Sequence, residues 1–345
     1  MKLPAGFGAA VIADPSNMFY FTGYRNADAV VVFTADGRRY YITDGRCLEE
    51  AAGAIDGFET VDVGPKSYID KAIDILKPLK NEKIGLEYDT LKQKDYARLA
   101  AVFAETGDIS EAVYALRAVK SDREIAAIKA AQKITDRVFE EVLERVSGGD
   151  ITEKELASFM DSRICLYGAS PAFDTIVAFG ENTSKPHAHP GERRIAAGDV
   201  VTIDFGAKYK GYCSDMTRSF AFRKTPEGYE EIYHAVLGAK NAAEKAIRAG
   251  MTGRECDSVA RDYLAGKGLD KYFTHSLGHS LGIDIHESPN LSPRCGSVIP
   301  LHAVTSVEPG VYISGKYGVR IEDIVVFEKE GVDNLTNSPE QLIIV

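Results

Sequence analysis

The sequence contains no tryptophan and no CxxC pair, and its five cysteines are an odd number that lie far apart. This pattern argues against a disulfide framework or a thiolate zinc site, and it fits a reducing compartment. The sequence also lacks a secretory signal and any run of about 18 apolar residues that could span a bilayer. We therefore expect a cytoplasmic protein with no membrane partner.

Basic residues are also fewer than acidic residues. Lysine and arginine number 41 against 51 aspartates and glutamates, which gives a net charge of −10 with neutral histidine. An acidic balance disfavours nucleic acid as a partner, because the phosphate backbone selects basic surfaces. The rest of the composition is globular, and 345 residues correspond to about 2.3 domains of ordinary size. The length therefore fits either one large domain or two.

The clearest domain boundary lies near residue 121. Ser121 and Glu124 have the spacing of a capping box, and apolar residues then recur at helical spacing until a glycine pair stops the helix. We predict that one domain covers residues 1–120 and that a second covers residues 121–345.

The two predicted domains differ in pattern. Before the boundary, strand-like and helix-like segments alternate, and a hairpin is expected to turn at Asp36-Gly37. After it, a second capping box starts at Thr152, and β-rich runs interrupted by two helices dominate from Phe173. Interleaved strands and helices of this kind predict the α/β (α+β) class.

Histidine is missing from the first 186 residues, and five of the seven histidines lie in two short clusters, PHAHP and HSLGHSLGIDIHE. Lone histidines are most often surface or hydrogen-bonded core residues, which is what we expect of His234 and His302. The clusters differ because they lie in glycine-rich surroundings near acidic residues embedded in apolar strands.

One pair of acids lies in VVTIDFGAKYKGYCSDMTRSF, where Asp204 sits inside an apolar run and Asp215 follows eleven residues later. A hairpin centred between Tyr209 and Lys210 would place the two acids opposite each other. A turn centred on Lys210-Gly211 would shift the register by two and make them diagonal neighbours on one face. In both registers the carboxylates come close and need a proton or a metal ion between them. The alternative is a pair of solvent-exposed acids.

A second pair, Glu308 and Glu322, lies between aliphatic residues on either side of the turn at 314–318. A hairpin centred on Gly315 would bring these two acids opposite each other. Four carboxylates with a nearby imidazole suit hard to borderline divalent ions such as Mn, Co or Fe, with Zn also compatible, and the acids suffice for two ions. Such a site predicts hydrolase chemistry.

At these residues the chain resembles the pita-bread metallopeptidases, the family of Xaa-Pro dipeptidase (prolidase), aminopeptidase P and methionine aminopeptidase. The resemblance covers nearly the whole chain. Five motifs match the metal ligands of the family in order and spacing: Asp204 in IDFGA, Asp215 in SDMTR, His279 in GHSLG, Glu308 in EPG and Glu322 in RIED.

The resemblance implies a dinuclear centre, with manganese the favoured metal. Asp204 would chelate one ion, Asp215 and Glu322 would bridge both, and His279 with Glu308 would hold the other. A metal-bridging hydroxide would attack the scissile carbonyl, with Glu308 as general base.

Two histidines match the non-ligand histidines of the family. His187 in PHAHP and His286 in IHE would bind substrate and stabilise the tetrahedral intermediate or assist proton transfer. The roles of His189 and His275 stay open. His275 and His279 have the spacing of a helical zinc pair, but the glycines around them favour a loop.

The N-terminal third resembles the creatinase-type domain of prolidases and aminopeptidase P, which implies cleavage before proline, small peptides with proline at position 2 as substrates, and a homodimer. Asn290 stands where some prolidases carry a basic residue for the carboxylate of a dipeptide, although Arg294 or Arg320 could take that role. Dipeptidase and aminopeptidase activity therefore both remain open. The alternatives are a hydrolase of this fold with another substrate, or a non-catalytic module that binds peptides or proteins.

Overall fold

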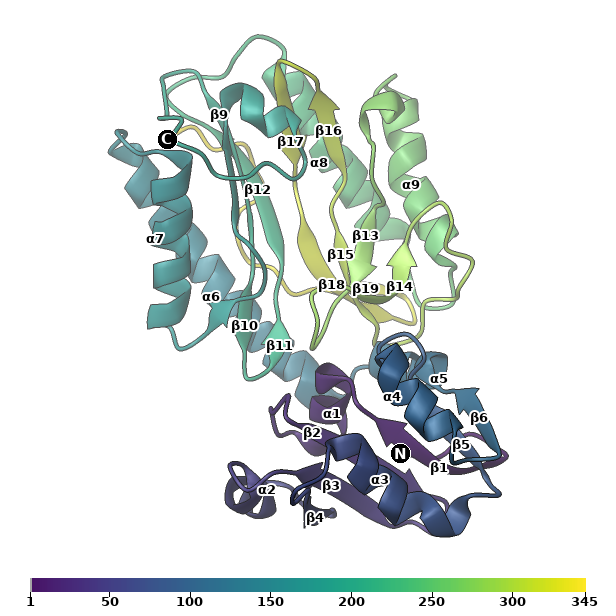
Figure 1. The fold of residues 1–345 in the computed structure, drawn as a ribbon. Coiled ribbons are helices and arrows are strands. Elements are labelled where there is room, and N and C mark those ends of the chain that lie inside the picture. Colours follow the sequence, from purple (N-terminus) through teal and green to yellow (C-terminus); the bar gives the residue numbers. More distant parts are fainter. Residues whose placement is uncertain (1) are drawn as a thin grey trace. The chain divides into compact units, whose positions relative to one another are not determined.

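The computed structural model describes residues 2–345, and the chain forms two compact units, Met1–Arg117 and Ala118–Val345 (Figure 1). No helix among the described residues is long and apolar enough to cross a membrane. Both units are mixed α/β structures.

The first unit is built on one six-stranded sheet in the order β4-β3-β2-β1-β5-β6. Strands β1, β5 and β6 run parallel, as do β3 and β4, whereas β2 is antiparallel to both of its neighbours. The elements are β1 (Phe7–Ile12), α1 (Pro15–Thr22), β2 (Ala29–Thr34), β3 (Arg39–Thr43), α2 (Leu48–Ala54), β4 (Glu59–Asp62), α3 (Tyr68–Leu76), η1 (Lys77–Leu79), β5 (Lys83–Leu86), α4 (Gln93–Ala100), β6 (Glu105–Asp108) and α5 (Ser110–Ala118).

Both faces of this sheet are buried, which explains why its central strands are continuously apolar. Along β1, Ala9 packs with α3 and α4 on one face, whereas Ala10 packs with α1, α2 and α5 on the other. The turn between β2 and β3 lies at the predicted Asp36-Gly37 position, where Gly37 has a φ of 92°. The sequence prediction of this hairpin is confirmed.

Four long helices of the second unit flank its strands: α6 (Asp122–Ser147), α7 (Glu153–Leu166), α8 (Tyr229–Ala246) and α9 (Gly253–Ala265). Helices α6 and α7 pack on β8, β9 and β12, while α8 and α9 pack on the strands that follow them in the chain (Figure 1). The capping boxes predicted at Ser121 and Thr152 are both formed, so each helix begins where its sequence indicates.

The strands of the second unit form four small sheets, in the orders β12-β9-β8, β11-β10-β7, β14-β13-β15-β18-β19 and β16-β17. Their bounds, with the two 3₁₀ helices η2 and η3 in their places along the chain, are β7 (Ser170–Pro171), β8 (Ile176–Phe179), η2 (Gly180–Ser184), β9 (Val200–Phe205), β10 (Ala207–Tyr209), β11 (Tyr212–Cys213), β12 (Met216–Ala221), η3 (Asp270–Tyr272), β13 (Gly278–Ser280), β14 (Glu287–Leu291), β15 (Val304–Val307), β16 (Gly310–Ile313), β17 (Tyr317–Arg320), β18 (Asp323–Glu328) and β19 (Gly331–Asn334).

The first acidic hairpin adopts the second of the two registers considered above. Lys208 pairs with Cys213 and Asp204 with Thr217, so the turn centres on Lys210-Gly211. Both turn residues have positive φ, 49° and 90°, as a type I′ hairpin turn requires. Asp215 is therefore a diagonal neighbour of Asp204.

The second acidic hairpin has the predicted register. Gly310 pairs with Arg320 and Val307 pairs with Asp323, which places Glu308 and Glu322 opposite each other across the hairpin. Each of these two acids lies in a break of two residues between consecutive strands. Such breaks let a side chain leave the regular alternation of a strand and turn toward the site.

The first hairpin depends on a close backbone approach at Gly206. A Cβ atom there would lie 1.9 Å from the carbonyl oxygen of Ser214, so Gly206→Ala must distort the hairpin that carries Asp204 and Asp215. We expect a loss of roughly 1–3 kcal/mol or more and a melting temperature several degrees lower, measured by calorimetry. The control is Gly296→Ala, where a Cβ would meet nothing within 4 Å. Equal melting temperatures for the two variants would contradict this account.

Candidate metal centre

The five predicted ligands converge on one cavity of about 290 Å³ in the second unit. Asp204 comes from β9, Asp215 from the residue before β12, His279 from β13, and the two glutamates from the strand breaks described above. His187 and His286 also line the cavity. The fold thus gathers residues separated by more than 100 positions in the sequence.

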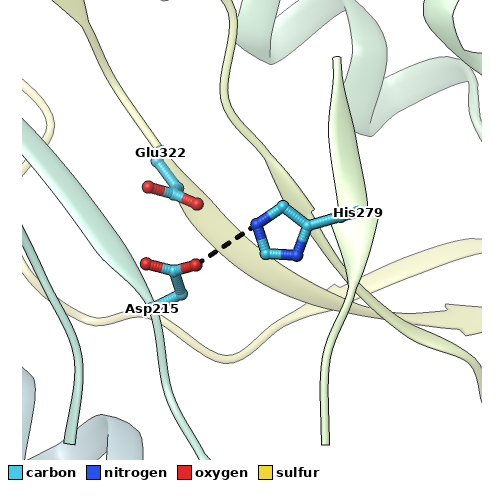
Figure 2. A group of neighbouring side chains, drawn as sticks. All are labelled: Asp215, His279 and Glu322. Carbon is cyan, nitrogen blue, oxygen red and sulfur yellow. Dashed lines mark ion pairs between the residues drawn. The ribbon is translucent and has the colours of Figure 1, made fainter. Parts of the chain in front are cut away.

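Three of the predicted ligands form a compact group. Asp215, His279 and Glu322 each offer one ligand atom, and these atoms all lie within 4.8 Å of one another. Figure 2 shows the three side chains pointing toward a common centre from three separate segments of the chain. His279 Nε2 lies 3.4 Å from Asp215 Oδ2 and 3.6 Å from Glu308 Oε1. Two donor atoms that each lie about 2.1 Å from one ion have a similar separation.

The acids of the site repel one another. Burial, together with the negative charges of Asp204 and Glu308, raises the pKa of Asp215 well above its ordinary value. Burial and the neighbouring carboxylates likewise raise the pKa of Glu322. Burial also raises the pKa of Glu308, although nearby basic side chains oppose that shift. In this arrangement ionised carboxylates require additional positive charge.

Two carboxylate oxygen atoms of the site have no hydrogen-bond donor among residues 2–345. Asp204 Oδ1 and Asp215 Oδ1 are buried and receive no hydrogen bond from any described residue. A buried carboxylate oxygen without a donor is costly, whereas a divalent cation would satisfy it. Carboxylate oxygens and one imidazole nitrogen are also the donor set that borderline divalent ions accept. The residues present therefore fit a metal site.

Arg320 is the buried cation next to these acids. Its Nη2 donates to Asp204 Oδ2 at 2.6 Å, and its Nε donates to Thr217 Oγ1 at 2.9 Å. Its Nη1 donates to the hydroxyl of Tyr312 at 2.7 Å and to the carbonyl of Pro186 at 3.1 Å. Arg320 therefore orients Asp204, and all three of its nitrogens are engaged by protein acceptors.

Thr217 extends the hydrogen-bond network of Arg320 to Glu322, another predicted ligand. Its hydroxyl donates to Glu322 Oε2 at 2.7 Å while it accepts from Arg320. Because Thr217 pairs with Asp204 in the hairpin register, the threonine lies between two predicted ligands. The orientation of both carboxylates is thus set by the same group of side chains.

His275 belongs to this hydrogen-bond network, outside the compact ligand group. Its Nδ1 lies 2.8 Å from the carbonyl of Ser276, and its Nε2 lies 2.9 Å from the hydroxyl of Tyr312. Burial, followed by the charge of Arg320, lowers the pKa of His275 to about 3, so its ring is neutral. The segment around it is not helical, as its glycines predicted. Both ring nitrogens are engaged, which leaves His275 no lone pair aimed at an ion.

The two remaining predicted catalytic histidines lie on loops. His187 is exposed and follows η2, in a loop that the buried carboxylate of Glu153 holds. Glu153 accepts from the backbone N–H of Phe179 at 2.7 Å and from that of Gly191 at 3.0 Å, on either side of the loop. His189 is exposed and is not among the described residues that line the cavity.

His286 lies just before β14, and its ring stacks edge-on against that of His279 with the ring centroids 4.4 Å apart. Burial, and to a lesser extent His279, lowers the pKa of His286. Asn290 lines the cavity, whereas Arg294, considered above as a partner for a substrate carboxylate, is not among the described lining residues.

Three supporting residues of this site were not singled out from the sequence: Tyr312, Thr217 and Glu153. Strand periodicity carried no signal for Tyr312, because Glu308 lies in the break before β16 and the alternation of a strand does not extend across that break. The register of the first hairpin could have indicated Thr217, since this residue pairs with Asp204. Glu153 follows a capping-box threonine and reads as an ordinary first-turn acid.

A cavity lined by four carboxylates, two of them buried, and an imidazole, with two oxygens that lack donors, is a metal site of the kind found in metal-dependent hydrolases. The chain belongs to metallopeptidase family M24, whose profile matches residues 126–329. The Creatinase/Prolidase N-terminal domain matches residues 4–119. The predicted family is therefore confirmed, as is the fold, a creatinase-like domain followed by a pita-bread domain. The family implies divalent metal ions.

Similar proteins match along almost the whole chain. The uncharacterized peptidase YqhT of Bacillus subtilis is 38% identical, over 99% of this chain and 96% of its own length. The solved structure of an Xaa-Pro dipeptidase from Bacillus anthracis is also 38% identical, covers 99% and 96% of the two chains, and has a TM-score of 0.94. An X-Pro aminopeptidase from Thermotoga maritima is 35% identical, covers 99% and 98%, and has a TM-score of 0.92.

The repulsion among the acids predicts that one substitution raises the melting temperature of the metal-free protein and reduces the gain in melting temperature on adding metal. Glu322→Gln removes one negative charge, so the metal-free variant should melt a few degrees higher than the metal-free wild type. The same variant should gain less from added metal, because a predicted ligand is weakened. Calorimetry with chelator and with added Mn²⁺ measures both effects.

The matched control is Glu192→Gln, because the carboxylate of Glu192 pairs with Lys154 at the surface. It should change neither melting temperature. A lower melting temperature of metal-free Glu322→Gln than of the metal-free wild type would contradict the proposed repulsion.

Proposed function

We propose that this protein hydrolyses the bond between an N-terminal residue and proline. One observation carries the proposal: all five predicted ligands and both predicted catalytic histidines meet in one cavity whose buried oxygens lack donors. The names of two close structural neighbours, an Xaa-Pro dipeptidase and an X-Pro aminopeptidase, support proline at the second position.

We propose the ligand set inferred from the sequence, with two divalent ions. Asp204 would hold one ion through the oxygen that Arg320 leaves free. His279 and Glu308 would hold the other, and both ions would share the carboxylates of Asp215 and Glu322. Oxygen-rich ligands with one imidazole favour manganese, with cobalt, iron or zinc as other candidates.

The bound ions would supply a Lewis acid for the scissile carbonyl and lower the pKa of the attacking water. Glu308 would accept the proton of that water, and the Ser306 hydroxyl, which donates to Glu308 Oε1 at 3.1 Å, orients its carboxylate. His286 lies beside His279, where a neutral imidazole can donate a hydrogen bond to the developing oxyanion. His187, on the opposite loop, would hold the substrate backbone.

The cavity also bears on peptide length. A dipeptide places its carboxylate close to the scissile bond, where a free cation would be favourable. Asn290 is neutral, and the nitrogens of Arg320 already donate to protein acceptors. We therefore propose that peptides extended beyond proline are cleaved at least as well as dipeptides, an aminopeptidase-type preference.

Several accompanying proposals complete this account. The five cysteines are free, which supports a reducing, cytoplasmic location. The two-domain division near residue 121, the homodimer, and small peptide substrates with no nucleic-acid or membrane partner are further proposals. A non-catalytic binding module is the second candidate, but such a module would not need to retain all five predicted ligands.

The decisive experiment compares three peptides with the manganese-loaded enzyme: Ala-Pro, Ala-Pro extended by three residues, and the same extended peptide with alanine in place of proline. We expect alanine release from both proline peptides, a kcat/KM for the extended peptide equal to or above that for the dipeptide, and no release from the alanine peptide. Glu308→Gln should lower kcat by about 10²–10⁴-fold.

No release from either proline peptide by the metal-loaded protein would refute the proposed activity. Alanine release from the dipeptide alone would refute the preference for extended peptides. It would still support cleavage of the bond before proline. Elemental analysis of the same sample separates an inactive enzyme from a binding module, because the module would take up no metal.

A further inference from the structure

Lys120 is a buried lysine that the proposed reaction does not use. Its side chain is 1% exposed and its Nζ lies 2.9 Å from Glu287 Oε2, whose side chain is 6% exposed. Its backbone N–H donates to the carbonyl of His302 at 3.1 Å, which holds the main chain next to the ammonium group. A lysine is buried in this way only when its charge is paired.

The partner of this lysine, Glu287, directly follows the predicted catalytic histidine in the sequence. Its other oxygen, Oε1, accepts from the backbone N–H of Ile283 at 2.9 Å and of Asp284 at 3.2 Å. One carboxylate therefore holds both ends of the five-residue segment 283–287. His286 lies within that segment.

The loop is packed closely against the ion pair. A Cβ atom at Gly282 would lie 2.9 Å from Glu287 Oε1 and 3.0 Å from the Cε of Lys120. The carbonyl of Gly282 accepts from the backbone N–H of Cys213 at 2.7 Å, two residues before Asp215. The loop therefore has little room to shift while the pair is intact.

We propose that the buried Lys120–Glu287 pair is a positioning device that holds the 283–287 loop so that His286 faces the metal centre. A buried ion pair is weak evidence for stability, because an apolar pair of the same volume is often as stable. It does fix one geometry, because the carboxylate must meet the ammonium and two amides at once. Lys120 thus acts through His286 and touches no reacting atom.

The kinetic test is a double-mutant cycle between Lys120→Met and His286→Ala, and it rests on the proposed Xaa-Pro activity. A displacement of about 1 Å at a positioned group costs on the order of 10²-fold in rate. We expect Lys120→Met to lower kcat by about 10- to 100-fold in the wild-type background, and by less than about 3-fold in the His286→Ala background. Equal losses in both backgrounds would overturn the proposal, because the pair would then act on the whole enzyme.

The matched control is Lys129→Met. It makes the same substitution nine residues later, in an exposed ion pair where Lys129 Nζ lies 3.0 Å from Asp333 Oδ2. This variant should keep the wild-type kcat. A loss in Lys129→Met equal to that in Lys120→Met would also overturn the proposal.

Hydrogen exchange gives a readout that does not depend on activity. Lys120→Met should accelerate exchange at the amides of Ile283 and Asp284, which donate to Glu287, while the metal content measured by elemental analysis stays at the wild-type value. Unchanged exchange at both amides would refute the anchoring. If the wild type cleaves no Xaa-Pro peptide, the proposed function fails, and this comparison alone decides the positioning role.

A second variant covers the case in which Lys120→Met does not fold because the carboxylate of Glu287 loses its ammonium partner. Lys120→Met combined with Glu287→Gln removes both charges of the pair, and the glutamine is no longer held by an ammonium group. Faster loop exchange and a reduced kcat in this folded protein would support the proposal. Wild-type values for both would overturn it.

Discussion

The mutual repulsion of four carboxylates around one cavity is the constraint on which the rest of this structure depends. Burial and neighbouring negative charge raise the pKa values of Asp215 and Glu322, and buried oxygens remain without a donor. Ordinary folding would avoid such an arrangement, because an uncompensated carboxylate in an apolar interior is costly. It persists because two hairpins bring the acids together, and because the helices behind those hairpins supply enough apolar burial to retain the strained site. The cation requirement of the site is thus a consequence of its packing.

The two hairpins were largely predictable, because their registers follow from turn chemistry. Gly315 sits at the centre of the second turn, and the pairing of Gly310 with Arg320 follows from that centre alone. The first hairpin left two registers open, since either Tyr209-Lys210 or Lys210-Gly211 could form the turn. The positive φ values of the observed turn explain why the glycine-containing pair is used. Local rules therefore sufficed for the ligands, and the capping boxes sufficed for the starts of α6 and α7.

The supporting charges could not be predicted, because they depend on contacts between distant segments. Lys240 on α8 is fully buried and pairs with Asp323 and with Glu340, 100 residues further along the chain. Arg218 pairs with the same Asp323 and donates from Nη1 to the carbonyl of Glu322 at 2.6 Å. In the sequence, a lysine on an amphipathic helix indicates a solvated face, and nothing local reveals that a C-terminal segment covers it. The charges that hold the backbone of Glu322 are therefore visible only once the tertiary structure is known.

Ligands and loops are secured by different means, and this difference bears on how the site works. The predicted ligands lie on or next to strands, whose backbone pairing limits their movement. The two catalytic histidines proposed here lie on loops, which are free to adapt but carry no ladder of hydrogen bonds. In both loops a buried carboxylate replaces that ladder: Glu153 accepts backbone N–H groups around the His187 loop, and Glu287 does so around the His286 loop. An anchored loop keeps an imidazole in place without adding another ionised ligand to a site already crowded with negative charge. A hydrogen-bond donor to an oxyanion beside a metal centre must be placed precisely, and here the imidazole is placed without a further negative charge in the site.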